Sequence, residues 1–257
     1  MIDIHCHILP GVDDGAVSLP ESLAMAREAA NEGIQKIIAT PHHQNGTYRN
    51  SRANIIGATD YLNGKLQKEQ IPVEILPGQE TRIYGDMLGD LKRGDVLPLN
   101  EGSGYVLVEL PTNHVPEYST QLLFDMQIAG YKPIIVHPEK NREFLENPDK
   151  LYRMVKNGSL TQISAPSVIG KAGRKVQRFS HQLLASNQTH FIASDAHNTK
   201  RRGFHLRQAY ADVRKSHGNE LEYQLMENSE ALLIGHTILM DPPDRVPSKK
   251  KWGLFNV

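Results

Sequence analysis

The first sixteen residues, MIDIHCHILPGVDDGA (residues 1–16), place two imidazoles on alternate positions at the end of an apolar run. Residues i and i+2 of a strand point to the same side, so we expect His5 and His7 to share one face. Asp13 and Asp14 follow shortly after a Pro-Gly pair. An H-x-H pair can hold a metal ion, but it can also be two unrelated side chains on one strand face. The remainder of the chain decides between these interpretations.

Length and composition limit the class of protein. The chain has 257 residues, 39% of them hydrophobic, and 29 Lys+Arg balance 29 Asp+Glu. This length suits one large domain or two small ones, and an α/β barrel commonly fills it as a single unit. Zero net charge gives no support to nucleic-acid binding. Cys6 is the only cysteine, which excludes an internal disulfide and favours a reducing compartment. With no basic leader and no apolar run of ~20 residues, we expect a cytoplasmic protein without stable membrane insertion.

Short β-branched or apolar runs recur along the chain and predict strands that are buried on both faces of a parallel sheet. These runs cover residues 2–6, 36–40, 73–77, 105–110, 133–137, 160–164 and 190–194. The first helix is predicted to begin at the capping-box pattern Ser18–Glu21 and to end at Gly33. Further helices are predicted over residues 51–70, 116–130, 148–158, 171–187 and 203–215. The alternation predicts βα units around a parallel sheet, closed as a barrel or left open, in one domain over residues 1–240.

Residues 241–257, DPPDRVPSKKKWGLFNV, differ in composition and are predicted to form a C-terminal tail. The segment carries three prolines, the Lys249–Lys251 run and two late aromatic residues. One interpretation is a solvated tail that packs loosely on the body. The other is a contact with a partner or a membrane surface, which three lysines alone would make weakly.

Residues of metal-ligand type stand at or just past the C-terminal ends of the predicted strands. They are His5, His7, Asp14, His42, Glu80, Glu109, His137, Asp195 and His197. In a parallel barrel these strand ends meet on the face that carries the active site. A single histidine after a strand is more often a structural residue, but the repetition at strand after strand favours a metal site.

The charges of these residues favour several ions. Four carboxylates crowded together without metal would repel one another and raise their pKa values. Three divalent ions would bring six positive charges against four negative ones, which leaves a surplus for a hydroxide and a phosphate dianion. Mixed nitrogen and oxygen ligands favour manganese, iron, zinc or cobalt over calcium. Such a cluster activates water and neutralises phosphoryl oxygens, so the chemistry favours phosphoester hydrolysis.

The linked motifs resemble the polymerase-and-histidinol-phosphatase (PHP) superfamily. The H-x-H with D-D-G is followed by T-P-H-H, P-G-Q-E, V-E-L-P, H-P-E and S-D-A-H, in an order similar to the bacterial protein-tyrosine phosphatases of capsule and exopolysaccharide operons. The resemblance runs from Met1 to about residue 240. It implies a distorted (β/α)7 barrel with three metal ions, usually manganese. It also implies the ligand sets His5, His7, Glu80 and Asp195 for one metal, Glu80, Glu109 and His137 for a second, and Asp14, His42 and His197 for the third.

The resemblance also implies a substrate and a mechanism. The family acts on phosphotyrosine in the tail of a bacterial tyrosine autokinase that controls polysaccharide synthesis. We expect a metal-bridging hydroxide to attack phosphorus directly, without a phosphoenzyme, and His42 or a metal-bound water to protonate the leaving tyrosinate.

One position departs from the family pattern. Relatives typically read H-P-E-R-N, whereas this chain has Lys140 at the arginine position and Arg142 two residues later. Lys140 keeps the charge but loses the planar two-point fork, and Arg142 is an alternative. A second family arginine matches Arg202. We expect Lys140 and Arg202 to orient the phosphate, and the alternative is that both are solvated surface charges.

Other functions stay open at this point. A small-molecule phosphatase acting on histidinol phosphate would share the metal site, and so would a non-catalytic metal-binding or kinase-docking module. An exonuclease is disfavoured because no polymerase module or basic stripe is present. A cysteine-dependent phosphatase would need an arginine six positions after Cys6, where Val12 stands. We therefore expect Cys6 to pack on the side of the strand opposite to His5 and His7. The sequence does not indicate an oligomeric state.

Overall fold

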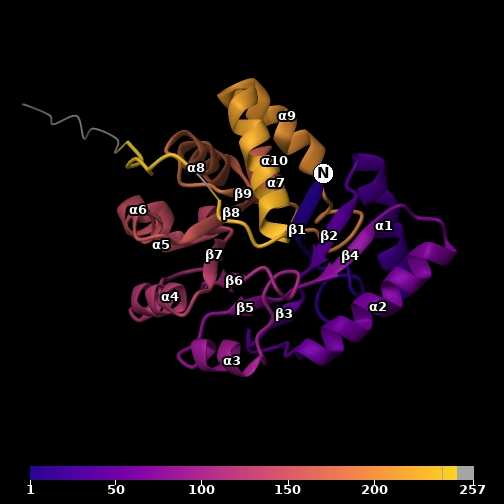
Figure 1. Cartoon of the computed structure of the whole chain (residues 1–257). Helices are drawn as coiled ribbons and strands as arrows, with labels where there is room; N and C mark the ends of the chain where they lie inside the picture. The colour runs from indigo at the N-terminus through magenta and orange to yellow at the C-terminus, as the bar shows by residue number, and fades with distance from the viewer. Residues whose placement is uncertain (239, 248–257) are drawn as a thin grey trace, which may run out of the picture.

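The computed structural model describes residues 1–238 and 240–247 and shows parallel strands with helices around them (Figure 1). The strands are β1 Ile2–Cys6, β2 Lys36–Ala39, β3 His42–His43, β4 Glu74–Pro77, β5 Glu80–Arg82, β6 Tyr105–Glu109, β7 Lys132–Val136, β8 Leu160–Ser164 and β9 Phe191–Ala193. The helices are α1 Leu19–Glu32, α2 Arg52–Lys68, α3 Met87–Arg93, α4 Ser119–Ile128, η1 Pro138–Lys140 (3₁₀), α5 Arg142–Glu146, α6 Pro148–Lys156, α7 Ala165–Val168, α8 Arg174–Ala185, α9 Leu206–His217 and α10 Asn219–Leu233.

The strands form two parallel sheets, in the orders β1-β2-β4 and β3-β5-β6-β7-β8-β9. β3 follows β2 after two residues and β5 follows β4 after two residues, and β3 pairs with β5 as β2 pairs with β4. β2 and β3 are therefore two parts of one interrupted strand, and so are β4 and β5. The first break contains Pro41, which has no N–H to donate to a ladder. Counted this way, the described residues contain seven consecutive parallel strands, and the predicted α/β fold with a parallel sheet in a single domain is confirmed.

Two places lack a regular ladder in the described part of the chain. β9 meets β1 through the isolated bridge between Cys6 and Ala196, beside which the His7 N–H donates to the Ala196 carbonyl at 2.9 Å. Between β4 and β6 the gap is occupied by the segment at Leu99 and Asn100. The Leu99 N–H donates to the Tyr105 carbonyl at 2.8 Å, and the Asn100 N–H donates to the Pro77 carbonyl at 2.8 Å. The ring of strands is thus distorted.

Most of the helices were predictable, but one cap differs from its prediction. α1 ends at Gly33, whose φ of 84° is the left-handed cap that glycine adopts easily. Ser18 is the N-cap of α1, but its side chain makes no capping hydrogen bond. The Glu21 carboxylate instead accepts from the Val17 N–H at 3.1 Å, so the predicted capping box is wrong in its hydrogen bonding.

Several elements were not predicted: the strands β3 and β5 and the helices α3, η1, α5, α7 and α10. Most are too short to show a hydrophobic period. α10 is long, but it starts after Gly218 without a side-chain cap, and its buried face mixes Leu225 and Leu232 with Asn228 and Ser229. A half-polar buried face weakens the amphipathic signal on which such predictions depend.

Alternate residues of the strands enter two different hydrophobic clusters, so both faces of the sheet are buried. In β7, Ile134 and Val136 belong to one cluster, while Ile135 belongs to the other, which packs against the helices. β6 repeats the pattern, since Tyr105 and Leu107 share the first cluster. The face that carries this first cluster points into the ring of strands and continues into the polar residues at the strand ends.

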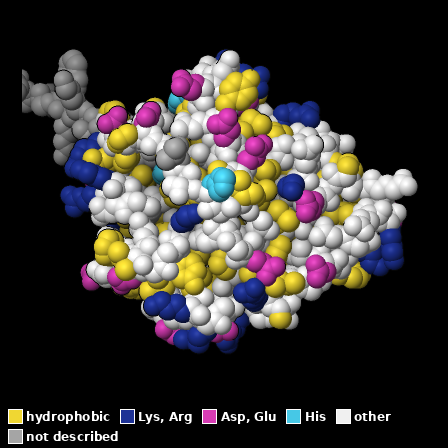
Figure 2. Space-filling model, viewed as in Figure 1, with side chains coloured by type: hydrophobic (Ala, Val, Ile, Leu, Met, Phe, Trp, Pro, Cys, Tyr) yellow, Lys and Arg dark blue, Asp and Glu magenta, His cyan; other side chains and the backbone are white. Residues whose placement is uncertain are grey.

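The last described residues pack against the body. The Asp244 N–H donates to the Ser186 carbonyl at 2.9 Å, and Arg245 forms an ion pair with Asp149. A domain boundary at residue 240 stays a prediction, and the Lys249–Lys251 run and the late aromatic residues lie outside the described residues. Figure 2 shows acidic and basic side chains interspersed on one face of the molecule. None of the helices in the described ranges combines the length and the apolarity needed to cross a bilayer.

Candidate metal centre

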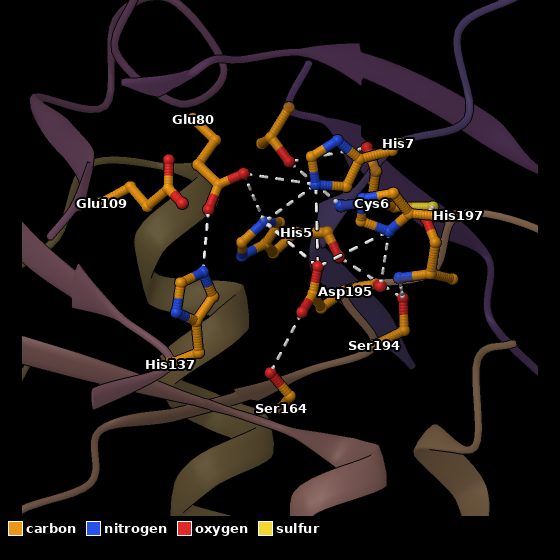
Figure 3. A network of polar contacts seen from close by, with 12 residues as sticks. His5, Cys6, His7, Glu80, Glu109, His137, Ser164, Ser194, Asp195 and His197 are labelled. Atoms are coloured by element: carbon orange, nitrogen blue, oxygen red, sulfur yellow. Dashed lines mark hydrogen bonds and ion pairs between the residues drawn. The ribbon is translucent and has the colours of Figure 1, made fainter. Parts of the chain in front are cut away.

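The polar strand ends converge at one end of the ring of strands. In β6, Glu109 continues the inward-facing alternation of Tyr105 and Leu107, and beyond β9 Asp195 continues that of Phe191 and Ala193. The side chains of the other predicted site residues reach the same place, as Figure 3 shows for His5, His7, Glu80, His137 and His197. Seven of the nine predicted residues fall into groups whose possible ligand atoms lie within 4.8 Å of one another: His7, Asp14, His42 and His197; His5, His7 and Glu80; and His42, Glu80 and Glu109.

These groups overlap with the predicted ligand sets without matching them fully. His7 joins the Asp14, His42 and His197 group, and His42 stands beside Glu80 and Glu109 where His137 was expected. His137 and Asp195 are nevertheless part of the cluster. His137 Nε2 lies 3.0 Å from Glu80 Oε1, and Asp195 Oδ1 lies 3.8 Å from His5 Nε2.

The Glu80 carboxylate contacts several imidazoles, and Figure 3 shows the contact with His137 among them. Its Oε2 is 2.8 Å from His42 Nδ1, 3.3 Å from His7 Nε2 and 3.4 Å from His5 Nε2. Burial alone would raise the pKa of this carboxyl, but the charge of His5, the hydrogen bond from His137 and the nearby His42 ring hold the pKa well below its usual value. Glu80 is therefore a fully buried carboxylate ringed by imidazoles, which suits an oxygen ligand shared between cations.

Asp195 connects the metal centre to a lysine. Its Oδ2 accepts from Lys140 Nζ at 2.7 Å and from Ser164 Oγ at 3.3 Å. Burial opposes the charged form, yet the Lys140 ammonium and the neighbouring imidazoles hold the pKa of Asp195 well below its usual value. Asp195 and His137 have positive φ angles, 54° and 35°, that non-glycine residues rarely adopt. Backbone strain of this kind concentrates at functional sites.

Asp14 and Arg202 form the solvent side of the cluster. Asp14 Oδ1 lies 3.4 Å from both His42 Nε2 and His197 Nε2, and Asp14 Oδ2 accepts from Arg202 Nη1 at 2.8 Å. The neighbouring His197 ring is the largest of the causes that hold the pKa of Asp14 below its usual value, and the Arg202 guanidinium adds to it. Burial and the nearby charge of His7 lower the pKa of His197 to about 4. A neutral imidazole is the form that binds a metal.

Three imidazoles of the cluster are fixed by a partner on their other ring nitrogen. His7 Nδ1 lies 2.6 Å from Asp13 Oδ2, and His5 Nδ1 lies 2.9 Å from Gln162 Oε1. His197 Nδ1 lies 2.9 Å from the Asp195 carbonyl. In each ring Nε2 is left free to face the cluster, which is the usual arrangement around metal-binding histidines.

Asp13 also holds the loop that carries Asp14. It accepts from the Gly15 N–H at 2.9 Å and from the His42 N–H at 3.0 Å. Gly15 approaches His7 so closely that an added Cβ would lie 2.0 Å from the His7 carbonyl oxygen, so only glycine fits there. Neither Asp13 nor Gln162 was predicted as a site residue. The adjacency of Asp13 to Asp14 was a weak signal, but Gln162 is 157 residues from His5 and carries no local motif.

Glu109 has a partner that the sequence analysis missed. Arg82 binds it with Nε and Nη2 at 3.0 and 2.9 Å, and the register of β5 on β6 places the two residues opposite each other. Burial and the charge of Glu80 raise the pKa of Glu109. The guanidinium offsets part of that repulsion and fixes the carboxylate at the edge of the cluster.

Of the two candidates for the family arginine, Lys140 reaches the cluster. It lies on the 3₁₀ turn η1, directly after the left-handed His137, and its ammonium binds Asp195. Arg142 is 70% exposed and pairs with Glu146 at 2.9 Å along α5. The structure therefore brings Lys140 and Arg202 to the cluster and leaves Arg142 on the surface.

Three buried atoms of the cluster have no hydrogen-bond partner among the residues described: His42 Nδ1, Glu80 Oε2 and His197 Nε2. His42 Nδ1 and Glu80 Oε2 are close, but they do not meet in hydrogen-bond geometry. Buried polar atoms without partners are costly, and bound cations would satisfy all three. The donor set of imidazoles and carboxylates fits divalent transition metals.

Cys6 has no part in this cluster. Its side chain is fully buried in the cluster that packs against the helices, and Sγ donates to the Ala196 carbonyl at 3.5 Å. Burial raises the pKa of the thiol well above its usual value, which keeps it protonated. The expected packing of Cys6 away from His5 and His7 is confirmed. His43 is also buried, and its Nδ1 donates to the Asn50 carbonyl at 2.8 Å.

Comparison with known proteins identifies the family of this chain. Residues 1–234 match the family described as capsular polysaccharide synthesis, CpsB/CapC. The chain is 49% identical over 255 residues to the tyrosine-protein phosphatase YwqE of Bacillus subtilis (strain 168), which covers 99% of this chain and 100% of that protein. It is 36% identical over 253 residues to CapC of Staphylococcus aureus, with 98% of each chain covered.

Solved structures of similar fold were also found. A structure from work on YwqE of Bacillus subtilis and CpsB of Streptococcus pneumoniae, described as unique metal-dependent tyrosine phosphatases, superposes with a TM-score of 0.94 at 50% identity. It covers 96% of this chain and 100% of that one. An organophosphorus hydrolase from Deinococcus radiodurans superposes with a TM-score of 0.58 at 13% identity, over 90% of this chain and 92% of that one, and shows likeness of fold alone.

Proposed function

Since this chain belongs to the CpsB/CapC family of capsular polysaccharide synthesis, we propose that it is a metal-dependent protein-tyrosine phosphatase. Its whole-length relatives and the superposed structure carry that activity in their names. The observation on this chain that supports the proposal most strongly is the set of imidazole and carboxylate side chains at the strand ends, with three buried atoms that have no partner among the described residues.

We propose that the cluster holds three divalent ions, with manganese as the metal of the active protein and iron, zinc or cobalt as alternatives. The residues proposed to hold them are His5, His7, Asp14, His42, Glu80, Glu109, His137, Asp195 and His197. Divalent ions in such a site supply activated water near neutral pH and neutralise charge on phosphoryl oxygens. Glu80 and Asp195 are buried and touch several imidazoles, so they are the carboxylates best placed to be shared.

We propose that two cations of the chain bind the phosphate. Lys140, at the end of η1, and Arg202, in the loop after β9, reach the cluster and pair with Asp195 and Asp14. With metal held by these carboxylates, both cations would be available to a phosphoryl group at the same edge. Cations fixed in this way stabilise the charge that develops in the transition state. His42, at the solvent side of the cluster, is proposed to deliver a proton to the leaving tyrosyl oxygen. Phenolate has a pKa of ~10, so this help is less critical than it would be for serine.

The proposed substrate is phosphotyrosine in a protein of capsule or exopolysaccharide synthesis, with a bacterial tyrosine kinase as the first candidate. The name of the matched family supports the process, and the names of the relatives support the modified residue. Work on a kinase tail would take place in the cytoplasm, in agreement with a single, buried cysteine.

One preparation tests the function. The manganese-loaded chain is assayed with a phosphotyrosine peptide, the matching phosphoserine peptide, histidinol phosphate and single-stranded DNA. We expect the phosphotyrosine peptide to have the highest kcat/KM. Faster turnover of histidinol phosphate would show a small-molecule phosphatase, and no turnover of any phosphoester would show a non-catalytic module.

A further inference from the structure

Tyr48 places an aromatic ring beside the metal centre. Its ring lies nearly parallel to that of His42, with 11° between the planes and 6.3 Å between the centroids. His42 belongs to two of the three groups of candidate ligands, so Tyr48 stands one ring away from the candidate metal positions. The Tyr48 side chain is only half-buried, so part of it is exposed at the surface beside the cluster.

The loop that carries Tyr48 is held in one conformation. It runs from the end of β3 to the start of α2, and Asn45 Oδ1 accepts from the N–H groups of Thr47 at 3.0 Å and Tyr48 at 2.8 Å. This is an Asx-type turn, which fixes the backbone locally. Gly46, with φ of 92°, supplies the left-handed residue that the turn requires.

The far end of the loop is tied to the metal centre. The Asn50 amide donates to the Val12 carbonyl at 3.1 Å and to the His42 carbonyl at 2.9 Å. The Asn50 carbonyl in turn accepts from His43 Nδ1 at 2.8 Å and from Gln79 Nε2 at 2.7 Å. The position of Tyr48 is thus coupled to the loop of Asp14 and to the strand of His42.

The Tyr48 hydroxyl does not account for this placement. No hydrogen bond of that hydroxyl is found within the part of the chain that the structure describes, in contrast to Tyr84, Tyr105, Tyr118 and Tyr131, whose hydroxyls bind carbonyl or carboxylate oxygens. The feature that the loop presents is the aromatic face. A phosphate bound at the cluster places its organic group next to the cluster edge, and aromatic pairs are favourable with centroids ~4.5–7 Å apart.

We propose that Tyr48 is a specificity-determining residue that packs against the phenyl ring of phosphotyrosine. The inference rests on the proposed function and adds to it a reason why an aryl phosphate binds better than an alkyl phosphate. In this proposal Tyr48 contacts the phenyl ring of the substrate, whereas Lys140 and Arg202 contact the phosphate. A phenylalanine at the position would serve as well, since the ring is the part that binds.

The test measures binding of two ligands to the manganese-loaded chain by calorimetry. One ligand is phosphonomethylphenylalanine, a phosphotyrosine analogue that is not hydrolysed, and the other is inorganic phosphate, which has no ring. For Tyr48→Ala we expect the Kd of the analogue to rise about tenfold, from the loss of an aromatic pair and its buried area. The Kd of phosphate should stay unchanged, and Tyr48→Phe should bind both ligands as the parent chain does. Tyr223→Ala, at an exposed tyrosine of α10, is the matched control and should match the parent chain.

Each other outcome overturns the inference in a distinct way. An equal rise in both Kd values would make Tyr48 a support of the metal centre rather than a ring-binding residue. No change in either Kd would show that the ring of the substrate lies elsewhere. A parent chain that hydrolyses the phosphotyrosine peptide while Tyr48→Ala binds the analogue normally refutes the inference alone. A parent chain that neither binds the analogue nor hydrolyses the peptide refutes the proposed function together with it.

Discussion

Asp13 and His7 form the shortest contact between a carboxylate and an imidazole in the candidate metal centre, with 2.6 Å between Oδ2 and Nδ1. Both side chains are buried, and the pair fixes the ring so that Nε2 faces Glu80 at 3.3 Å. A carboxylate in this position orients a metal-binding imidazole and raises its basicity.

Asp13→Asn keeps the size of the side chain but removes its charge. We expect the affinity for Mn²⁺ to fall by about 10- to 100-fold, as is usual when such a partner is lost. Titration of the metal-free protein by calorimetry gives the affinity directly. Asp60→Asn, at an exposed position of α2, is the control. An unchanged affinity in Asp13→Asn would mean that the loop hydrogen bonds alone hold His7 in place.

Cys6→Ala tests whether the buried thiol takes part in the reaction. The side chain is inaccessible and its thiol stays protonated, so we expect kcat/KM to change by less than about twofold. The native protein should also resist alkylation by iodoacetamide. Loss of turnover in a folded Cys6→Ala protein would show that a nucleophilic cysteine had been overlooked.

Lys140 and Arg202 are predicted to bind the phosphate, whereas Arg142 is not. We expect Lys140→Ala and Arg202→Ala each to lower kcat/KM for a phosphotyrosine peptide by about 100-fold, the scale of losing a charge-stabilising donor. Arg142→Ala is the matched control, because its side chain is exposed and pairs with Glu146, and it should keep the parent rate. If Arg142→Ala lost as much activity as Lys140→Ala, the assignment of the phosphate-binding cation would be wrong.

His190 should make stability depend on pH independently of the metal centre. It is buried, its Nδ1 accepts from the Thr161 N–H at 3.1 Å, and burial lowers its pKa from 6.5 to about 4. The unfolded chain therefore takes up a proton below pH 6.5 that the folded chain refuses until about pH 4, so stability is lost as the pH falls through this window. At 1.36 kcal/mol per pH unit, the loss from this group between pH 7 and pH 5 is about 2 kcal/mol.

Urea unfolding of the metal-free protein in EDTA measures this effect. His190→Gln keeps an acceptor for Thr161 but cannot be protonated. Its free energy of unfolding should therefore fall by about 2 kcal/mol less than that of the parent chain between pH 7 and pH 5. Identical falls in the two proteins would show that His190 is not kept neutral by the fold.

Much of the fold could be predicted from the sequence because the strands are buried on both faces. Continuous apolar runs such as Tyr105–Glu109 and Lys132–Val136 are a strong signal, and their ends marked the site. β3 and β5 were missed because strands of two and three residues, each after a break, show no period. Without β5, the cross-strand pairing of Arg82 with Glu109 could not be foreseen.

The candidate site was predictable where a side chain follows a strand, and not where long-range contacts position it. Gln162 orients His5 from a strand far along the chain, and only the folded arrangement of the strands brings them together. The positive φ angles of His137 and Asp195 were likewise not predictable, since few non-glycine residues adopt them and no local motif marked these two positions. The motif at residues 137–142 contains two candidate phosphate-binding cations, Lys140 and Arg142. Only the conformation of η1 shows that Lys140 is the one that reaches the cluster.

Phosphate release from a phosphotyrosine peptide by EDTA-treated and then Mn²⁺-titrated protein tests the whole account most directly, with bound metal measured in the same samples. We predict no turnover in the metal-free chain and full recovery as Mn²⁺ fills the cluster at the strand ends. Asp195→Ala, which removes one of its buried carboxylates, should stay inactive at every Mn²⁺ concentration. Undiminished turnover in a sample shown to contain no metal would contradict the account.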